Sequence, residues 1–234
     1  MFKGILLDLD NTLYEYDRCH EFAIGKVEQF VTQKLNISEE TFSLSFNEAK
    51  HQVKSQVGNT AASHNRLLYM QIMCEILGVP ASQYAYKLYN EYWDNYLSLI
   101  EKSLGVDDFL FRCKQQGLKI CLVSDLTAHI QYRKINTLGI AEYIDYIVTS
   151  EEVGIEKPSA LMFEAAVKKI QLGVNEVCMV GDNLERDIKG ALTLDIAAFW
   201  INHRETVPQN INSSKVNIIN NFTQLVDVIF PDAR

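Results

Sequence analysis

The chain opens with a compact apolar run over residues 2–7, which shows no alternation of polar and apolar positions and is followed directly by Asp8. A continuous apolar run of this length is typical of a strand that is buried on both faces in a parallel sheet. We therefore predict a strand here, with Asp8 at its carboxyl end.

From about residue 17 to residue 100 the apolar positions recur at spacings of three and four, which is the period of an amphipathic helix. The pattern predicts helices over His20–Leu35, Glu39–Val57, Ala61–Leu77 and Gln83–Leu99. The predicted N-caps of the last three are Ser38, Thr60 and Ser82, because hydroxyl side chains accept hydrogen bonds from the first free amides of a helix. This stretch is predicted to be an all-helical block.

After residue 100 short apolar runs alternate with amphipathic segments. Strands are predicted at Lys119–Val123, Tyr143–Thr149, Glu176–Val180, Ile196–Trp200 and Val216–Ile219, and helices at Ala128–Leu138, after Pro158, at Leu184–Leu194 and at Phe222–Phe230. Such alternation implies a parallel sheet with helices on both faces. The predicted fold class is α/β, with a Rossmann-like core of residues 1–15 and 101–234 and an inserted all-α domain of residues 16–100.

Composition narrows the classes of function. The 234 residues leave room for a main domain and a modest insertion, and 47% hydrophobic with 22% charged residues is a usual mixture for a folded globular protein. A net charge of -8 disfavours polymeric nucleic acid, whose binding depends on Lys and Arg. No apolar run approaches the roughly 20 residues that cross a bilayer, and the five cysteines lack metal-like spacing. We expect a cytoplasmic protein with free thiols and no membrane partner.

Polar side chains follow the predicted strands, at the edge where open α/β sheets bind ligands. Asp8 and Asp10 are carboxylates one residue apart, and they point to the same side if the first strand continues in extended form. Like charges held this close require a cation or a shared proton. A hard divalent cation with oxygen ligands is the natural counter-ion, so the pair predicts a metal site.

Further clusters follow the later strands. Ser124 stands after one strand, where its hydroxyl could bind a phosphate oxygen beside the amides of the next helix. Lys157 stands just before a helix whose first residue would be Pro158. Asp182 follows another strand, and Asp187 can turn back toward it. Each cluster alone has an ordinary explanation as a cap or turn, but the ordered set is typical of phosphoryl transfer by positioning and charge neutralisation.

The set resembles the four motifs of the haloacid dehalogenase-like (HAD) hydrolase superfamily. The resemblance extends from residue 1 to about residue 202, and the helical insertion is similar to the superfamily's α-helical cap domain. The matching residues are Asp8-Leu9-Asp10-Asn11-Thr12, Ser124, Lys157-Pro158, and Gly181-Asp182 with Asp187.

The resemblance implies a role for each matching residue. Asp8 would attack phosphorus to form an aspartyl-phosphate, and Asp10 would act as general acid and base. The transferring phosphoryl group would be held by Thr12, Ser124 and Lys157. The resemblance also implies Mg²⁺ as the cofactor, bound by the Asp8 carboxylate, the Asp10 backbone carbonyl and Asp182, with Asn183 and Asp187 supporting these ligands.

One position departs from the family pattern. The family commonly has Asn after the Ser or Thr of its second motif, whereas Asp125 follows Ser124 here. A carboxylate that pointed at the phosphate would be unfavourable. We therefore expect Asp125 to face away from the phosphate and leave it out of the phosphate-binding set.

The type of reaction follows partly from Asp10. Halide leaving groups need no proton and alkoxides do, so Asp10 favours an oxygen ester. Residues 149–158 and 200–205 are similar to bacterial pyrimidine 5′-nucleotidases, and residues 178–190 to N-acylneuraminate-9-phosphatases. We predict a Mg²⁺-dependent phosphoric monoester hydrolase, monomeric or homodimeric, whose substrate is a small nucleoside monophosphate or sugar phosphate. A phosphomutase and a non-catalytic phosphate-binding regulatory protein stay open as alternatives.

Substrate selection is expected in the cap. The polar stretch Asn59–Arg66, at the start of a predicted helix, is the most suggestive segment. The candidates to reach the non-phosphate end of a substrate are Arg18, His20, His51, Asn65, Arg66, Tyr69 and Trp93.

Overall fold

The computed structural model describes residues 2–203 and 214–231. The chain divides into two compact units. The core unit comprises Met1–Glu15, Glu101–Asp125 and Leu138–Arg234, and the helical unit comprises Tyr16–Ile100 and Leu126–Thr137. The predicted domain boundaries stay a prediction, and the two units differ from it in residues 126–137, which the prediction assigned to the core.

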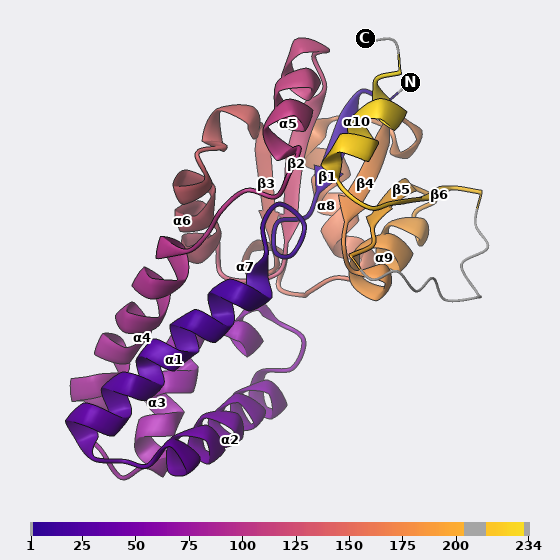
Figure 1. Ribbon diagram of the computed structural model, residues 1–234. Coiled ribbons are helices and arrows are strands. Elements are labelled where there is room, and N and C mark those ends of the chain that lie inside the picture. Colours follow the sequence, from indigo (N-terminus) through magenta and orange to yellow (C-terminus); the bar gives the residue numbers. More distant parts are fainter. Residues whose placement is uncertain (1, 204–213, 232–234) are drawn as a thin grey trace. The chain divides into compact units, whose positions relative to one another are not determined.

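A parallel sheet forms the centre of the core unit (Figure 1). Over the described residues it has six strands in the order β3-β2-β1-β4-β5-β6. The strands are β1 (Gly4–Leu7), β2 (Lys119–Ser124), β3 (Tyr146–Thr149), β4 (Val177–Gly181), β5 (Ala197–Ile201) and β6 (Val216–Ile219). Strands β2 and β3 lie on one side of β1, and the later strands β4, β5 and β6 lie on its other side. The carboxyl ends of β1 and β4 therefore flank the topological switch point, where α/β sheets bind ligands.

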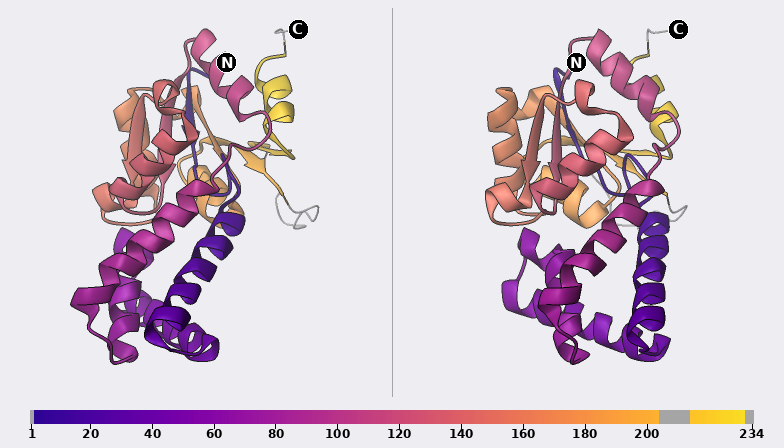
Figure 2. Two further views of the ribbon diagram at one scale, coloured as in Figure 1. Left: turned by 60° about the vertical axis from the view of Figure 1, so that its left-hand side comes forward. Right: turned by 90° about the vertical axis from the view of Figure 1, so that its left-hand side faces the viewer.

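Helices cover both faces of this sheet (Figure 2). Leu6 of β1 belongs to a buried apolar cluster with Phe163 of α8, while Ile5 and Leu7, whose side chains alternate with Leu6, are also fully buried. On α5 and α10, Phe109 and Phe222 pack with ring centroids 5.2 Å apart. The helices of the core unit are α5 (Val106–Gln115), α7 (Ser150–Val153), α8 (Ala160–Ile170), α9 (Lys189–Leu192) and α10 (Phe222–Ile229), with shorter turns η2 (Ala141–Tyr143), η3 (Val174–Glu176) and the π-helical η4 (Leu184–Ile188).

The helical unit is built around buried aromatic side chains. Its elements are α1 (Tyr16–Leu35), α2 (Glu39–Val57), η1 (Ala61–His64), α3 (Arg66–Ile76), α4 (Ala81–Ser98) and α6 (Ala128–Leu138). The α4 residues Trp93 and Tyr96 are buried, and the Nζ of Lys134 on α6 lies 5.6 Å from each of their ring centroids. Such cation–π contacts, together with an ion pair between Arg133 and Asp94 at 2.8 Å, explain why α6 groups with this unit.

The predicted fold class is confirmed, and most predicted elements occur within a few residues of their expected positions. Ser38 is the N-cap of α2, where its side chain accepts a hydrogen bond from the Thr41 amide at 3.2 Å. The prediction for Ser82 is wrong, because α4 begins at Ala81 and Ser82 lies inside it. Thr60 occupies the N-cap place of η1 but makes no capping hydrogen bond with its side chain.

Two further helix boundaries differ from the prediction. The expected helix over residues 61–77 is interrupted at Asn65, whose side chain accepts from the Leu67 amide at 2.9 Å and caps α3. Pro158 is not the first residue of a helix, because α8 begins at Ala160 with Ser159 as its N-cap. Helix α5 was not predicted, although its buried residues Val106, Phe109, Leu110 and Cys113 follow a helical spacing.

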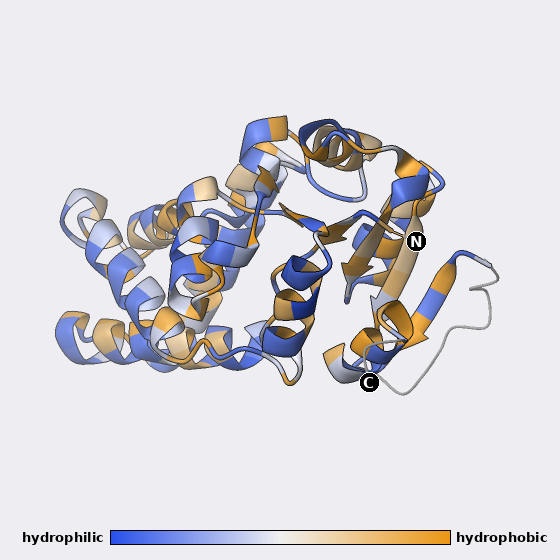
Figure 3. Cartoon of the chain, turned by 90° about the horizontal axis from the view of Figure 1, so that it is seen from above, coloured by the Kyte–Doolittle hydropathy of each residue, from blue (hydrophilic) through white to orange (hydrophobic). Residues whose placement is uncertain are grey.

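In the described part of the chain, no helix is both long enough and apolar enough to cross a membrane. Hydrophobic and hydrophilic residues are interspersed along the helices, as expected for amphipathic helices that bury one side (Figure 3).

Candidate active site

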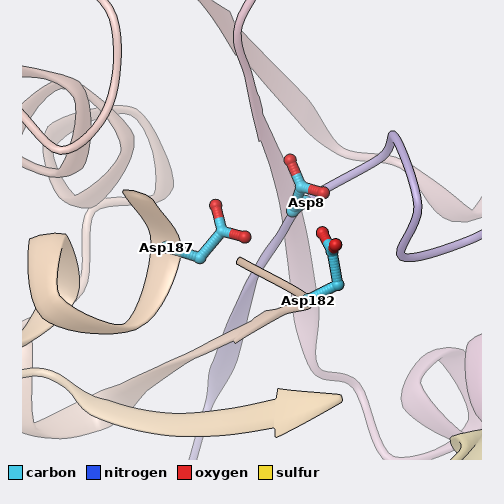
Figure 4. Close-up of side chains that lie close together, drawn as sticks. All are labelled: Asp8, Asp182 and Asp187. Atoms are coloured by element: carbon cyan, nitrogen blue, oxygen red, sulfur yellow. The ribbon is translucent and has the colours of Figure 1, made fainter. Parts of the chain in front are cut away.

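The carboxyl ends of β1 and β4 bring two carboxylates together. Asp8 directly follows β1 and Asp182 directly follows β4, and these strands are neighbours in parallel register. The Asp8 amide extends the pairing by donating to the Val180 carbonyl at 2.9 Å. Asp187, from η4, completes a group in which each of the three residues offers an oxygen within 4.8 Å of the others. The three side chains point toward one another (Figure 4).

Asp187 can approach because the end of β4 is a glycine. A Cβ atom on Gly181 would lie 2.5 Å from an Asp187 carboxylate oxygen, so a larger residue would displace that side chain. The Asn183 amide donates to the Asp187 Oδ2 at 2.9 Å, and the Asn183 side chain accepts from the amides of Glu185 and Arg186 at 3.1 and 3.0 Å. Asn183 thus orders the turn that returns Asp187 to the site.

Lys157 is a buried cation between two of the carboxylates. Its Nζ lies 2.6 Å from the Asp8 Oδ1 and 2.6 Å from the Asp187 Oδ1. The Lys157 amide donates to the Asp125 Oδ1 at 2.9 Å, and the Asp125 Oδ2 lies 3.3 Å from an Arg186 nitrogen. Asp125 therefore holds the backbone of the Lys157 loop with one oxygen and pairs with Arg186 through the other.

Thr12 is brought onto Asp8 by a reversal of the chain. Asn11 has a φ of 62°, a left-handed conformation that Asn tolerates better than most residues. The Thr12 hydroxyl donates to the Asp8 Oδ2 at 2.7 Å and accepts from the Asp182 amide at 3.1 Å. Thr12 therefore links the ends of β1 and β4.

Asp10 and Ser124 have different surroundings from the carboxylate group. The Asp10 carboxylate accepts a hydrogen bond from the Tyr14 hydroxyl, and its side chain is not one of the three clustered carboxylates. In the predicted metal site, Asp10 contributes its backbone carbonyl and not its carboxylate. Ser124 is buried at the end of β2, the strand next to β1, and is therefore on the same edge of the sheet as Asp8. The roles assigned to both residues stay predictions.

The charges of the three clustered carboxylates favour the binding of a cation. Burial raises the pKa of Asp8 to about 6, although the Lys157 ammonium opposes this shift. Burial, with the Asp8 and Asp187 carboxylates nearby, raises the pKa of Asp182 to about 8. Three carboxylates thus share one ammonium group. An all-oxygen, negatively charged donor set of this kind fits Mg²⁺.

Several contacts around the site were not predicted from the sequence. The Trp200 indole donates to the Asp182 backbone carbonyl at 2.7 Å, and a ring nitrogen of His203 lies 2.8 Å from the Asn11 carbonyl oxygen. A signal for Trp200 was available, because it stands near the end of the predicted strand that neighbours β4. Nothing in the sequence pattern indicated that the Tyr14 hydroxyl would donate a hydrogen bond to the Asp10 carboxylate. Residues 204 and 205, which are part of the stretch similar to nucleotidases, lie outside the described residues.

The family model of haloacid dehalogenase-like hydrolases matches residues 2–195. Among curated proteins, a ribulose-1,5-bisphosphate 5-phosphatase from Halopiger xanaduensis is 35% identical over 193 residues, covering 82% of this chain and 81% of the relative. A glyceraldehyde 3-phosphate phosphatase from Methanocaldococcus jannaschii is 26% identical and covers 98% of this chain and 97% of the relative.

A pyrimidine 5′-nucleotidase from Escherichia coli is similar over a shorter stretch, with 33% identity over 95 residues, 40% of this chain and 42% of the relative. Among solved structures, a 2-haloacid dehalogenase from Pseudomonas syringae superposes with a TM-score of 0.77 at 19% identity, covering 98% of each chain. The structural match supports the fold. The two phosphatases match more than four fifths of this chain, so their matches include at least part of the helical insertion as well as the core.

Proposed function

The chain belongs to the haloacid dehalogenase-like hydrolase family and is a phosphoric monoester hydrolase, and we propose that it is a Mg²⁺-dependent sugar phosphatase that works through an aspartyl-phosphate at Asp8. The observation that carries the proposal is the setting of the Asp8 carboxylate. One of its oxygens contacts the Lys157 ammonium and the other accepts from Thr12, beside Asp182 and Asp187. A carboxylate held this way has one orientation from which to attack.

In the first step an Asp8 oxygen forms a bond to phosphorus as the bond from phosphorus to the substrate oxygen breaks. Lys157 and Thr12, which hold Asp8 before the reaction, are placed to donate hydrogen bonds to the phosphoryl oxygens. Their contribution is electrostatic, because charge spreads over these oxygens in the transition state. Ser124 is proposed to contribute a hydroxyl from the end of β2.

Asp10 is proposed to move the protons. It gives a proton to the leaving alkoxide in the first step and takes one from the attacking water in the second, which releases phosphate and restores Asp8. The hydrogen bond from Tyr14 holds the Asp10 carboxylate in place. Tyr14 is therefore a positioning residue.

Mg²⁺, held by Asp8, the Asp10 carbonyl and Asp182, would neutralise negative charge on the phosphoryl group and on the carboxylates around it. Asp187 is proposed to hold Lys157 and the Asn183 amide, since both of its oxygens already have these partners.

Sugar phosphates are favoured over nucleotides as the substrate class. The relatives that match more than four fifths of this chain act on ribulose 1,5-bisphosphate and on glyceraldehyde 3-phosphate, according to their names. The nucleotidase matches 40% of the chain. Because the longer matches include the helical insertion, they bear on the part of the protein that is expected to select the substrate.

The experiment is a phosphate-release assay with purified protein and Mg²⁺. The substrates are ribulose 1,5-bisphosphate, glyceraldehyde 3-phosphate, uridine 5′-monophosphate and p-nitrophenyl phosphate, and Asp8→Asn is the control for contaminating phosphatases. We expect a sugar phosphate to have the highest kcat/KM. A higher kcat/KM for the nucleotide would overturn the substrate class, and isomerised sugar phosphate without released phosphate would indicate a mutase.

A further inference from the structure

The backbone of Asp182 is held by two side chains of the core unit. The last pair in the parallel register of β4 and β5 is Gly181 with Trp200, so Asp182 is the first residue after the paired part of its strand. Backbone groups that are shielded from water need hydrogen-bond partners. The Asp182 amide donates to the Thr12 hydroxyl at 3.1 Å, and the Asp182 carbonyl accepts from the Trp200 indole at 2.7 Å. The peptide groups on both sides of the Asp182 Cα atom are therefore anchored.

Trp200 is itself firmly placed on the sheet. Its side chain is 6% exposed and belongs to the buried apolar cluster that also contains Met179 of β4 and Ala198 of β5. Residues two apart on a strand point to the same face, so Ala198 and Trp200 lie on the same side of β5. A packed indole ring of this kind presents one polar group, its N–H, at a determined position. The hydrogen bond from Trp200 thus ties the loop after β4 to the buried centre of the core unit.

The anchored backbone carries one of the three clustered carboxylates. Asp182 offers an oxygen within 4.8 Å of oxygens of Asp8 and Asp187 (Figure 4). Like charges repel, so these carboxylates, when ionised, lower their energy by moving apart unless a cation lies between them. The Thr12 hydroxyl contacts the Asp182 side chain as well as its amide, at 3.3 Å from the Oδ1 atom. The anchors on Asp182 therefore oppose the repulsion and keep its carboxylate directed at the group.

We propose that Trp200 is a positioning residue for the metal site, and that its hydrogen bond to the Asp182 carbonyl increases the affinity of the protein for Mg²⁺. The inference rests on the proposed function, because it takes Asp182 as a ligand of Mg²⁺. A site whose ligands are already in place loses less conformational entropy on binding, which increases its affinity. Groups that orient metal ligands typically contribute about 10–100-fold to metal affinity. This hydrogen bond joins two neutral groups, so we expect an effect at the lower end of that range.

The second tryptophan of the chain provides a matched control. The sequence contains two tryptophans, Trp93 and Trp200. Trp93 is buried in the helical unit, and its Nε1 atom has no hydrogen-bond partner among the residues that the structure describes. Replacement by Phe removes an indole N–H from a buried ring at either position. Only Trp200→Phe also removes a hydrogen bond to Asp182.

The test is a Mg²⁺ titration of the full chain without substrate, followed by the shifts of backbone amide signals in NMR spectra. The proteins are wild type, Trp200→Phe, Trp93→Phe and Asp182→Asn. We expect the Kd for Mg²⁺ to rise about tenfold in Trp200→Phe and to keep its wild-type value in Trp93→Phe. Asp182→Asn should bind most weakly, which would assign the measured binding to this site. An equal Kd in wild type and Trp200→Phe overturns the inference.

A second measurement keeps Trp200 intact, so it does not depend on how well Trp200→Phe folds. In Trp93→Phe the only indole N–H signal is that of Trp200. We expect this signal to shift on addition of Mg²⁺ with the same Kd as the amide signals, because the ion binds the residue whose carbonyl the indole contacts. An indole signal that does not move while the amide signals saturate overturns the inference.

The outcomes separate this inference from the proposed function. If wild-type protein releases phosphate in the absence of Mg²⁺ and Mg²⁺ shifts no signal, the proposed metal dependence fails and the inference fails with it. If Asp182→Asn binds Mg²⁺ as well as wild type does, Asp182 is not a ligand and both are overturned. If Mg²⁺ binds and activates the wild type but binds equally well to Trp200→Phe, the inference alone fails.

Discussion

The core unit places three carboxylates around one ammonium group, whereas the helical unit places an arginine and two lysines around a cavity with no carboxylate in its lining. Each region holds like charges closer together than is favourable without a ligand of opposite charge. The first is suited to a divalent cation and the second to an anion.

The two regions differ in how firmly their side chains are held. Asp8, Lys157 and Asp187 are buried and joined by contacts of 2.6 Å, so their positions are determined by one another. In the cavity Arg66 is buried, but Lys50 and Lys54 are exposed and their ammonium groups can move. We therefore expect single changes in the core site to cause large losses and changes in the cavity to cause graded ones.

The largest effect is expected for Asp8→Asn. The amide has nearly the shape of the carboxylate but is a poor nucleophile, so turnover should fall on the order of 10⁴-fold or more, with no covalent intermediate. The measurement is phosphate release together with intact-mass analysis after acid quench. Asp108→Asn, at an exposed position on α5, is the matched control and should keep wild-type activity. A phosphorylated Asp8→Asn protein would contradict the assignment of the nucleophile.

Removal of the metal should abolish turnover reversibly. Without Mg²⁺ the carboxylates near the substrate repel an anionic phosphate ester, so EDTA should reduce activity to background and added Mg²⁺ should restore it. Ca²⁺, which is larger and less strictly coordinated, should restore little. The check is a metal titration of phosphate release, and full activity in chelator would exclude the proposed metal dependence.

Asp10→Asn should lower the turnover rate about 10²–10⁴-fold, which is the typical contribution of a general acid or base. With p-nitrophenyl phosphate, whose leaving group needs little protonation, the first step should survive better than the second. A phosphorylated enzyme should then accumulate and appear as added mass after acid quench. The opposite pattern, with phosphoenzyme on Asp8→Asn and none on Asp10→Asn, would exchange the two roles.

The smallest predicted effect is a loss of folding stability at acidic pH that is caused by His20. Burial, with Arg66 and Lys50 nearby, lowers the pKa of His20 from 6.5 to about 4, and its Nδ1 lies 2.7 Å from the Tyr92 hydroxyl. Between these values the unfolded chain binds a proton that the folded chain does not. The contribution of neutral His20 to the free energy of unfolding is therefore fully present above pH 6.5 and is lost as the pH falls toward 4.

The measurement is urea unfolding at pH 7 and pH 5. His20→Gln should lose less stability between the two values than wild type does, whatever its stability at pH 7. An equal pH dependence in wild type and His20→Gln would show that the histidine does not respond to the cations around it.

Much of the fold could be predicted because its signals are local. The helices over residues 39–57 and 128–138 and the strand over residues 216–219 occur at the predicted bounds, since hydrophobic periodicity is a property of a single segment. Ser82 was misjudged because α4 begins at Ala81, two residues before the predicted start, with Pro80 as its N-cap. The core site could be located because polar residues that follow parallel strands must meet at one edge of the sheet.

From the sequence alone one could thus predict the order of most elements, a helical insertion after the first strand, and the strand ends that carry Asp8, Ser124 and Asp182. The tertiary structure alone shows that the Lys157 ammonium lies between Asp8 and Asp187. It also shows that Arg66 is buried in the same cavity lining as Lys50, with no carboxylate paired to it among the described residues. The physical reason is that parallel strand ends converge by topology alone. Side chains on separate helices meet only where packing sets the position and rotation of each helix, and no local pattern encodes that geometry.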